Sequence, residues 1–281
     1  MTLPSMHSQD TRAFRGPVSA TIFDWAGTVL DFGCIAPVAA FSEAFALAGV
    51  EISEAEARLP MGAAKREHVQ QILAQPAVQA RWQAARGAPS SKADVDSLYQ
   101  AFLGADEANC AKYSAMIPGA LETIAVLRAQ GIAIGSTTGY PRSVMDGLAP
   151  LAAAQGYRPD CCITVSDVAR GRPWPDMPLA NALALGVADV SGCVVVDDSP
   201  TGLSSGRAAG MWAVGIVASG NEVGLSLTDW QALDADARDR LRQSAWSKLE
   251  AAGAHYVIDT VADLPPVVDA INARLRLGER P

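Results

Sequence analysis

The chain has 281 residues, of which 49% are hydrophobic and 19% are charged, and its formal net charge is -8 at pH 7. This composition is that of a globular protein with one large or two modest domains. An acidic balance does not suit binding to nucleic acid or to an anionic membrane surface. No apolar run reaches the length of a membrane span, so we expect neither of these partners.

The cysteines and histidines indicate which cellular compartment and which kind of metal ion suit this chain. The cysteine count is odd, two cysteines are adjacent and no Cys-x-x-Cys pair occurs, which favours free thiols in a reducing cytoplasm. The five cysteines are Cys34, Cys110, Cys161, Cys162 and Cys193. With only three histidines, any metal should be a hard cation held by carboxylates, such as Mg²⁺. Residues 1–17 lack the apolar core of a signal peptide and are predicted to form a disordered or loosely ordered tail.

The segment Val18–Thr28 opens the folded part of the chain. Its first half is apolar and β-branched, which predicts a buried strand, and Asp24 stands where that strand ends. Gly27 permits a close turn immediately afterwards. Ligands bind at the carboxyl ends of strands in an open parallel sheet. Asp24 is therefore a candidate nucleophile or metal ligand, and a helix-capping role is an equally open alternative.

Helices alone are predicted between residues 34 and 115. Serines at helix starts, a proline at a first turn and a Pro-Met-Gly break mark their ends. The predicted helices are Pro37–Gly49, Ser53–Arg58, Ala63–Leu73, Pro76–Arg86 and Ser91–Tyr113. We expect residues 33–114 to form an all-helical cap domain inserted after the first strand.

Strands and helices alternate in the rest of the chain. The predicted strands are Ile132–Gly135, Cys161–Thr164, Cys193–Val196, Trp212–Ile216 and His255–Ile258. The predicted helices are Ala120–Gln130, Pro141–Ala154, Asp176–Leu185, Gly202–Ala209, 228–252 and Leu264–Leu277. This alternation predicts an α/β fold with a doubly wound parallel sheet, built from residues 18–32 and 115–281.

Polar segments follow the second, third and fourth predicted strands. They are Ser136–Tyr140, Gly171–Pro173 and Asp197–Ser199. Because the carboxyl ends of parallel strands converge on one crevice, acidic groups there can hold a divalent cation, and hydroxyl and N–H groups can hold phosphate oxygens. Each segment alone has an ordinary alternative as a turn, a helix cap or a surface ion pair.

The order of these residues resembles the haloacid dehalogenase (HAD) superfamily of phosphoryl-transfer enzymes. The resemblance implies that Asp24 attacks phosphorus and forms an aspartyl-phosphate. It also implies a Mg²⁺ ion held by Asp24, the backbone carbonyl of Ala26 and Asp198. Thr138, Gly139 and Arg172 are the implied phosphate-binding residues.

Three departures from that pattern are informative. Phosphatases of the superfamily usually have an acid two residues after the nucleophile, which protonates the departing alkoxide, whereas this chain has Ala26. The usual phosphate-facing lysine has no counterpart between Lys112 and Lys248, so Arg172 is expected in its place. Gly202 stands where another metal-site acid is common, with Asp197 or a water molecule as open substitutes, while Ser199 or Thr201 could help to hold the groups around the metal.

A lysine in the predicted cap domain extends the resemblance to one family within this superfamily. Met61, Gly62, Lys65 and His68, taken with Phe23–Thr28, resemble the phosphonatase family. Further matching segments are Cys34, Gly135–Tyr140, Gly171–Pro173 and Gly210–Trp212. The resemblance implies that Lys65 forms a Schiff base with phosphonoacetaldehyde. The protonated imine then accepts the electron pair of the P–C bond, no alkoxide leaves, and an acid at position 26 is not needed.

The remaining implied roles are less specific. His68 is expected to be a proton shuttle or a water positioner, with a packed cap histidine as the even alternative. Cys34 and Met61 should form an apolar wall around the imine, and Tyr140 should line the site or pack in the core. The resemblance also implies a homodimer formed through the cap.

The chain is therefore expected to hydrolyse phosphonoacetaldehyde to acetaldehyde and phosphate, within the degradation of 2-aminoethylphosphonate. A HAD-type phosphatase or phosphomutase acting on a small phosphate ester is the alternative enzyme, although it lacks the proton donor at Ala26. A non-catalytic HAD-like binding protein is a third possibility. The presence of Asp24, Arg172 and Asp198 argues against it.

Overall fold

The computed structural model describes residues 14–281, so most of the tail predicted for residues 1–17 lies outside the described residues. At its centre is a six-stranded parallel sheet with the strand order β3-β2-β1-β4-β5-β6. The strands are β1 (Ala20–Phe23), β2 (Ala133–Thr138), β3 (Cys161–Thr164), β4 (Cys193–Asp197), β5 (Trp212–Ile216) and β6 (Tyr256–Ile258). This is the doubly wound α/β fold that the sequence predicts.

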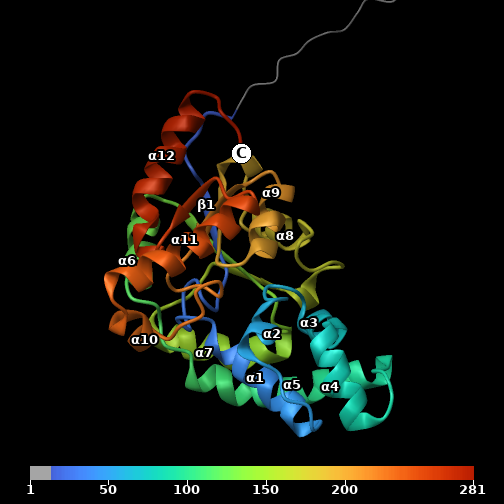
Figure 1. Cartoon of the computed structure of the whole chain (residues 1–281). Helices are drawn as coiled ribbons and strands as arrows, with labels where there is room; N and C mark the ends of the chain where they lie inside the picture. The colour runs from blue at the N-terminus through green and yellow to red at the C-terminus, as the bar shows by residue number, and fades with distance from the viewer. Residues whose placement is uncertain (1–13) are drawn as a thin grey trace, which may run out of the picture.

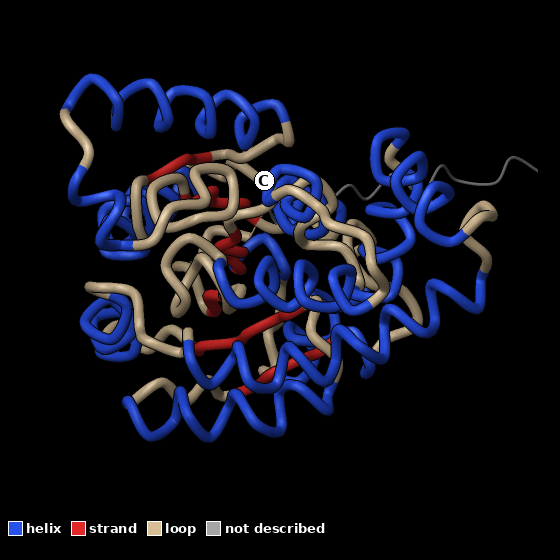
Figure 2. The backbone as a smooth tube through the Cα atoms, turned by 60° about the horizontal axis from the view of Figure 1, so that its bottom comes forward, coloured by secondary structure: helices blue, strands red, loops and turns tan. Residues whose placement is uncertain are grey.

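Helices cover both faces of the sheet (Figure 2). Both faces need cover because successive side chains of a strand point to opposite faces, and the strands are apolar on both. Along β4, Val194 and Val196 face the main core, whereas Cys193 and Val195 face a second cluster. Figure 1 shows α6 and α12 on one side of the sheet and α8 and α9 on the other. The core helices are α6 (Ala120–Ala129), α7 (Arg142–Gln155), α8 (Asp176–Ala184), α9 (Pro200–Ala208), α10 (Leu227–Ala232), α11 (Ala235–Ala251) and α12 (Leu264–Arg276).

The helices between β1 and α6 lie together at the carboxyl end of the sheet (Figure 1). They are α1 (Ile35–Leu47), α2 (Glu54–Arg58), α3 (Lys65–Ala74), α4 (Pro76–Arg86) and α5 (Lys92–Lys112). Ser53 and Ser91 form the capping boxes that begin α2 and α5, and Pro76 occupies the first turn of α4. We call Ile35–Lys112 the helical insert.

The structure corrects two predicted elements. β2 extends to Thr138, three residues beyond the predicted end at Gly135, because the hydroxyl-bearing segment pairs with β1 and β3. The single helix predicted over 228–252 is two helices, α10 and α11, because Leu233 is extended and Asp234 caps the second helix.

The order of the strands determines where on the sheet the candidate site lies. β1 lies between β2 and β4, where the winding of the sheet changes direction, and ligands bind outside the carboxyl ends of the strands at such a point. Phe23 is in register with Val196 of β4, and the Asp24 N–H donates to the Val196 carbonyl at 2.9 Å. Asp24 and Asp197 therefore leave adjacent strands at the same level.

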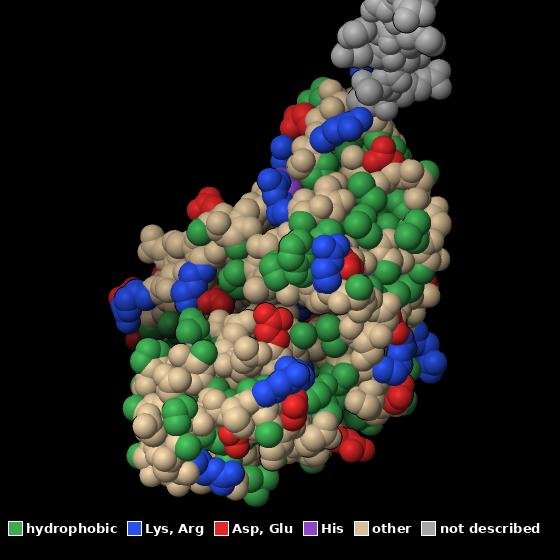
Figure 3. Space-filling view, turned by 90° about the vertical axis from the view of Figure 1, so that its right-hand side faces the viewer, with side chains coloured by type: hydrophobic (Ala, Val, Ile, Leu, Met, Phe, Trp, Pro, Cys, Tyr) green, Lys and Arg blue, Asp and Glu red, His purple; other side chains and the backbone are tan. Residues whose placement is uncertain are grey.

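Figure 3 shows one face on which acidic, basic and hydrophobic side chains are interspersed. All five cysteines are free thiols, as the sequence predicts. Among residues 14–281, none of the helices combines the length and the apolar character that crossing a bilayer requires.

Candidate active site

A cavity lies between the carboxyl end of the sheet and the helical insert. The core supplies residues from the ends of β1, β2 and β4, and the insert supplies residues from the starts of α1 and α3. The cavity is lined by Asp24, Ala26, Cys34, Pro37, Met61, Gly62, Lys65, Thr138, Gly139, Tyr140, Arg172, Asp198 and Ser199. The structure thus brings together every site residue predicted from the sequence except His68.

Three carboxylates meet at the core side of the cavity. Oxygen atoms of Asp24, Asp197 and Asp198 all lie within 4.8 Å of one another, and all three residues are buried. Burial raises the pKa of Asp198 and of Asp197, and the negative charges of the neighbouring carboxylates raise both further. A divalent cation among these oxygens would relieve that repulsion, so the donor set fits a hard metal ion.

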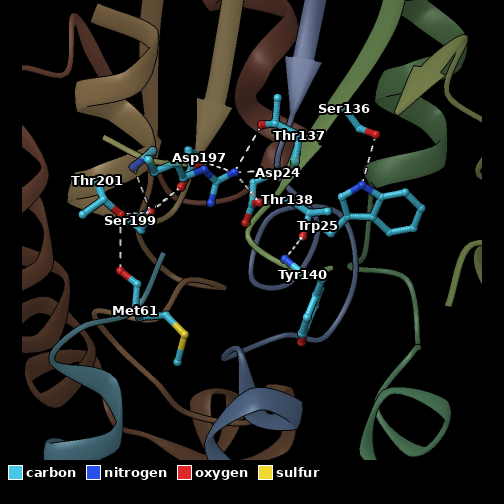
Figure 4. Close-up of polar contacts among 12 residues, drawn as sticks. Asp24, Trp25, Met61, Ser136, Thr137, Thr138, Tyr140, Asp197, Ser199 and Thr201 are labelled. Carbon is cyan, nitrogen blue, oxygen red and sulfur yellow. Dashed lines mark hydrogen bonds and ion pairs between the residues drawn. The ribbon is translucent and has the colours of Figure 1, made fainter. Parts of the chain in front are cut away.

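Arg172 neutralises part of this charge. Its guanidinium nitrogen Nη2 is 2.6 Å from Asp24 Oδ1 and 2.9 Å from Asp197 Oδ2. The same nitrogen donates to Thr137 Oγ1 at 3.2 Å, which fixes the guanidinium against β2 (Figure 4). The sequence predicted Arg172 as a phosphate ligand. The structure adds that its guanidinium pairs with Asp24, the candidate nucleophile, and with Asp197.

Asp197 takes the space of the side chain that position 202 lacks. A Cβ atom on Gly202 would lie 1.9 Å from Asp197 Oδ2, so only glycine fits while Asp197 keeps this conformation. Asp197 Oδ1 accepts hydrogen bonds from the N–H and hydroxyl of Ser199, whose Oγ in turn accepts from the Gly202 N–H. Among the substitutes left open for the acid missing at Gly202, the geometry favours Asp197.

The placement of the Asp197 carboxylate in the space beside Gly202 gives a testable expectation. Gly202→Asp alone should destabilise the fold by about 3–5 kcal/mol, because it forces a second carboxylate into the volume of the first. Asp197→Gly should lower Mg²⁺ affinity and phosphate release by about tenfold or more. The double variant Asp197→Gly/Gly202→Asp should recover most of both properties, as measured by calorimetry, phosphate assay and thermal melting. A double variant no better than Asp197→Gly would contradict this account.

The hydroxyl groups of β2 have separate partners. Ser136 accepts a hydrogen bond from Trp25 Nε1 at 3.0 Å, and Thr137 accepts from Arg172. Thr138 lines the cavity, and its Oγ1 accepts from the Tyr140 N–H at 3.1 Å (Figure 4). Only Thr138 of the three is therefore placed to meet a ligand directly.

Lys65 enters the cavity from the first residue of α3. Its Nζ atom lies 4.8 Å from the centre of the Tyr140 ring and 3.9 Å from Met61 Sδ. Lys65 is buried and forms no ion pair with any residue between 14 and 281. Burial raises the pKa of Cys34 and of Tyr140 well above their usual values, so both remain protonated beside it.

The helical insert closes tightly over the core. A Cβ atom on Gly62 would lie 2.2 Å from Thr201 Oγ1, and this glycine also has a positive φ of 88°. Thr201 Oγ1 donates to the Met61 carbonyl at 3.4 Å (Figure 4). Arg58 donates to the carbonyls of Gly33 and Gly224 at 2.8 and 2.9 Å, which ties α2 to the core.

His68 does not line the cavity. Its Nε2 lies 2.7 Å from the Ala57 carbonyl oxygen, and its ring packs 4.0 Å from that of Phe41. Burial and the charge of Lys65 hold the pKa of His68 well below its usual value, so the ring is neutral. A neutral ring bonded to a carbonyl carries its hydrogen on Nε2. This geometry favours the packing alternative over the proton shuttle that the sequence analysis weighed equally.

The sheet order, the strand-end acids and the helical insert define the class of protein. The family model of haloacid dehalogenase-like hydrolases matches residues 18–210, which is more than half of the chain.

Comparison with curated proteins and solved structures narrows the class. The chain is 48% identical to a phosphonoacetaldehyde hydrolase of Hahella chejuensis over 96% of this chain and 92% of that protein. It is 50% identical to the phosphonoacetaldehyde hydrolase of Klebsiella pneumoniae over 94% and 99%. The crystal structure of a phosphonoacetaldehyde hydrolase-like protein from Oleispira antarctica superposes with a TM-score of 0.94 at 47% identity, covering 95% of this chain and 97% of that one. The chain belongs to the phosphonoacetaldehyde hydrolase family within the haloacid dehalogenase-like hydrolases.

Two further residues were not predicted from the sequence, Pro37 in the cavity lining and Asp106 behind it in the helical insert. Pro37 lines the cavity without a polar group that a motif would reveal. Asp106 is a fully buried acid on α5, and both of its oxygens lack a hydrogen-bond partner among the residues that the structure describes. A signal for Asp106 existed, because it interrupts the apolar face of the predicted helix Ser91–Tyr113 at helical spacing.

Proposed function

We propose that this protein hydrolyses the P–C bond of phosphonoacetaldehyde to give acetaldehyde and phosphate. The observation that carries the proposal is that Lys65 and Asp24 line one cavity from opposite sides, with no acid at Ala26. The names of the relatives at about 50% identity point the same way.

The proposed steps use an amine and a carboxylate of this chain. The Lys65 amine condenses with the aldehyde to form an imine and water, and protonation of the imine gives an iminium ion. Asp24 then attacks phosphorus. The electron pair of the breaking P–C bond forms the C=C bond of an enamine, and the phosphoryl group becomes an aspartyl-phosphate. Water hydrolyses this acyl phosphate, and protonation and hydrolysis of the enamine release acetaldehyde and the free amine.

The other lining residues orient the substrate in this proposal. Arg172, Thr138 and the Gly139 backbone bind the phosphonate, and the Arg172 charge offsets repulsion between it and Asp24. Cys34, Met61 and Tyr140 surround the imine and exclude water from it. His68 supports the Phe41 ring and does not transfer a proton.

The acidic cluster fits Mg²⁺ as the metal. Asp24, Asp198 and the Ala26 carbonyl would hold it, with Asp197 close enough to contribute. When bound, the ion would screen the negative charges of carboxylate and phosphonate from each other. Residues 33–114 would act as a cap domain over 18–32 and 115–281. A homodimer formed through the cap and a cytoplasmic location remain predictions.

Product analysis tests the function directly. Purified protein with Mg²⁺ and phosphonoacetaldehyde should release phosphate and acetaldehyde in equal amounts, and EDTA should suppress the release by about a hundredfold or more. Added Mg²⁺ should restore it. Borohydride in the presence of substrate should attach the two-carbon unit to Lys65, as located by peptide mass spectrometry. Turnover of simple phosphate esters without any adduct would favour the phosphatase or phosphomutase alternative.

A further inference from the structure

The buried face of α5 carries one carboxyl group among apolar side chains. The face consists of Val95, Leu98, Phe102, Asp106, Asn109 and Cys110. Asp106 is 0% exposed, and no N–H or O–H donor among residues 14–281 bonds to either of its oxygens, so that the thiol of Cys110 is the one polar hydrogen that the structure places beside it. A buried carboxyl group in this situation is stable when it is protonated or when a positive charge stands nearby.

Lys65 is the cation whose charge acts on Asp106. Phe102 lies one helical turn before Asp106 and stacks on Phe41 with ring centres 4.3 Å apart. Phe41 is in turn 5.6 Å from Lys65 Nζ. Lys65 Nζ therefore contacts one ring of the stacked Phe41–Phe102 pair, and Asp106 lies one helical turn after the other ring. Both Lys65 and Asp106 are buried, and neither forms an ion pair among residues 14–281.

The other titratable groups around Asp106 leave its protonation dependent on the charge of Lys65. Burial raises its pKa to about 7, and the charge of Lys65 and the Cys110 thiol oppose that rise. Tyr140 and Cys110 are themselves held protonated by burial. Asp31 is the other nearby acid. It also has a pKa raised to about 7 by burial, but its two oxygens accept hydrogen bonds from the Ile35 and Ala36 N–H groups at the start of α1.

We propose that Asp106 is a positioning residue for the Lys65 nitrogen, holding a proton while Lys65 is a free amine and becoming the counter-ion of the iminium. This inference rests on the proposed Schiff-base function. When amine and aldehyde give imine and water, the imine nitrogen takes up one proton and Asp106 releases one, which leaves a carboxylate to balance the positive charge of the iminium. P–C cleavage makes the nitrogen neutral again as an enamine. A solvent proton then adds to the enamine carbon, and the proton freed by hydrolysis of the resulting iminium returns to Asp106.

Reductive trapping with acetaldehyde and borohydride separates this role from a structural one. In the wild-type protein, the rate of adduct formation on Lys65 should show an inflection near pH 7. In Asp106→Asn the rate should fall by about tenfold or more and the inflection should vanish, because the iminium has lost its counter-ion. Asp106→Glu, which keeps the carboxyl group, should recover part of the rate. Trapping in Asp106→Asn with the wild-type rate and inflection would overturn the proposal.

A measurement on the wild-type protein keeps the test independent of how the variants fold. At pH 6, infrared difference spectra on adding acetaldehyde should show loss of the C=O band of a buried, protonated carboxyl group. Lys65→Met should keep that band, since it forms no imine. An unchanged band in the wild type, or its loss in Lys65→Met, would overturn the role of Asp106. Failure of the wild-type protein to form any Lys65 adduct would instead overturn the proposed function on which that role depends.

Discussion

Lys65→Arg should release phosphate from phosphonoacetaldehyde at least about a thousandfold more slowly than the wild type. Arginine keeps the positive charge at the start of α3, but its guanidinium cannot condense with an aldehyde at neutral pH. Without the imine, the P–C bond would have to break with a carbanion as the leaving group. Each factor of ten in rate corresponds to about 1.4 kcal/mol of barrier, so the loss amounts to about 4 kcal/mol or more.

The retained charge makes Lys65→Arg more informative than a truncation. If Lys65 acted only by attracting the phosphonate, arginine would preserve most of the rate. Lys92→Arg is the matched control, because Lys92 is exposed at the start of α5 and lies outside the cavity lining. It should leave phosphate release and borohydride labelling unchanged. A Lys65→Arg protein that turns over within tenfold of the wild type would rule out the Schiff base.

The sheet was predictable because its strands are short apolar runs separated by helices with clear ends. β3 and β5 have the predicted bounds, and their residues are apolar or β-branched over nearly their whole length. The end of β2 was not predictable, because Ser136 and Thr137 suit both a turn and a buried strand. Pairing on both sides, which is a long-range effect, decides between the two.

The site was predictable where chemistry dictates residue type. Asp24 and Lys65 have no substitute in the proposed reaction, and both line the cavity. Contacts that depend on packing were not predictable. The occupation of the Gly202 side-chain space by Asp197 follows from atoms of β4 and α9 that only the folded structure brings together. The orientation of His68 likewise depends on the Ala57 carbonyl of another helix.

Arg172 shows how the two kinds of information combine. The lack of any lysine between Lys112 and Lys248 predicted Arg172 as the phosphate-facing cation, and the structure shows its guanidinium between Asp24 and Asp197. A buried arginine with two carboxylates carries its charge at any ordinary pH. Its single positive charge offsets only part of the charge of Asp24, Asp197 and Asp198. The site would therefore accept a further anion only when a second cation balances these carboxylates, and the proposed metal would supply that charge.

Asp24→Asn should abolish phosphate release, with a loss of about ten-thousandfold or more, and yet still allow the imine to form. The amide has the shape of the carboxylate but is a far poorer nucleophile toward phosphorus. Arg172 keeps Asp197 as a partner 2.9 Å away, so the fold should survive. Since Lys65 is untouched, borohydride should trap the entire phosphonoacetaldehyde unit on it.

Mass spectrometry distinguishes the two adducts. The wild-type enzyme should carry the two-carbon unit after reduction, because the phosphoryl group has already left, whereas Asp24→Asn should carry the same unit with its phosphonate still attached. Asp176→Asn is the control, since Asp176 pairs with Arg170 at the surface and lies outside the cavity lining. It should behave as the wild type. A dephosphorylated adduct in Asp24→Asn would mean that another group accepts the phosphoryl unit, and the division of labour between Asp24 and Lys65 would have to be abandoned.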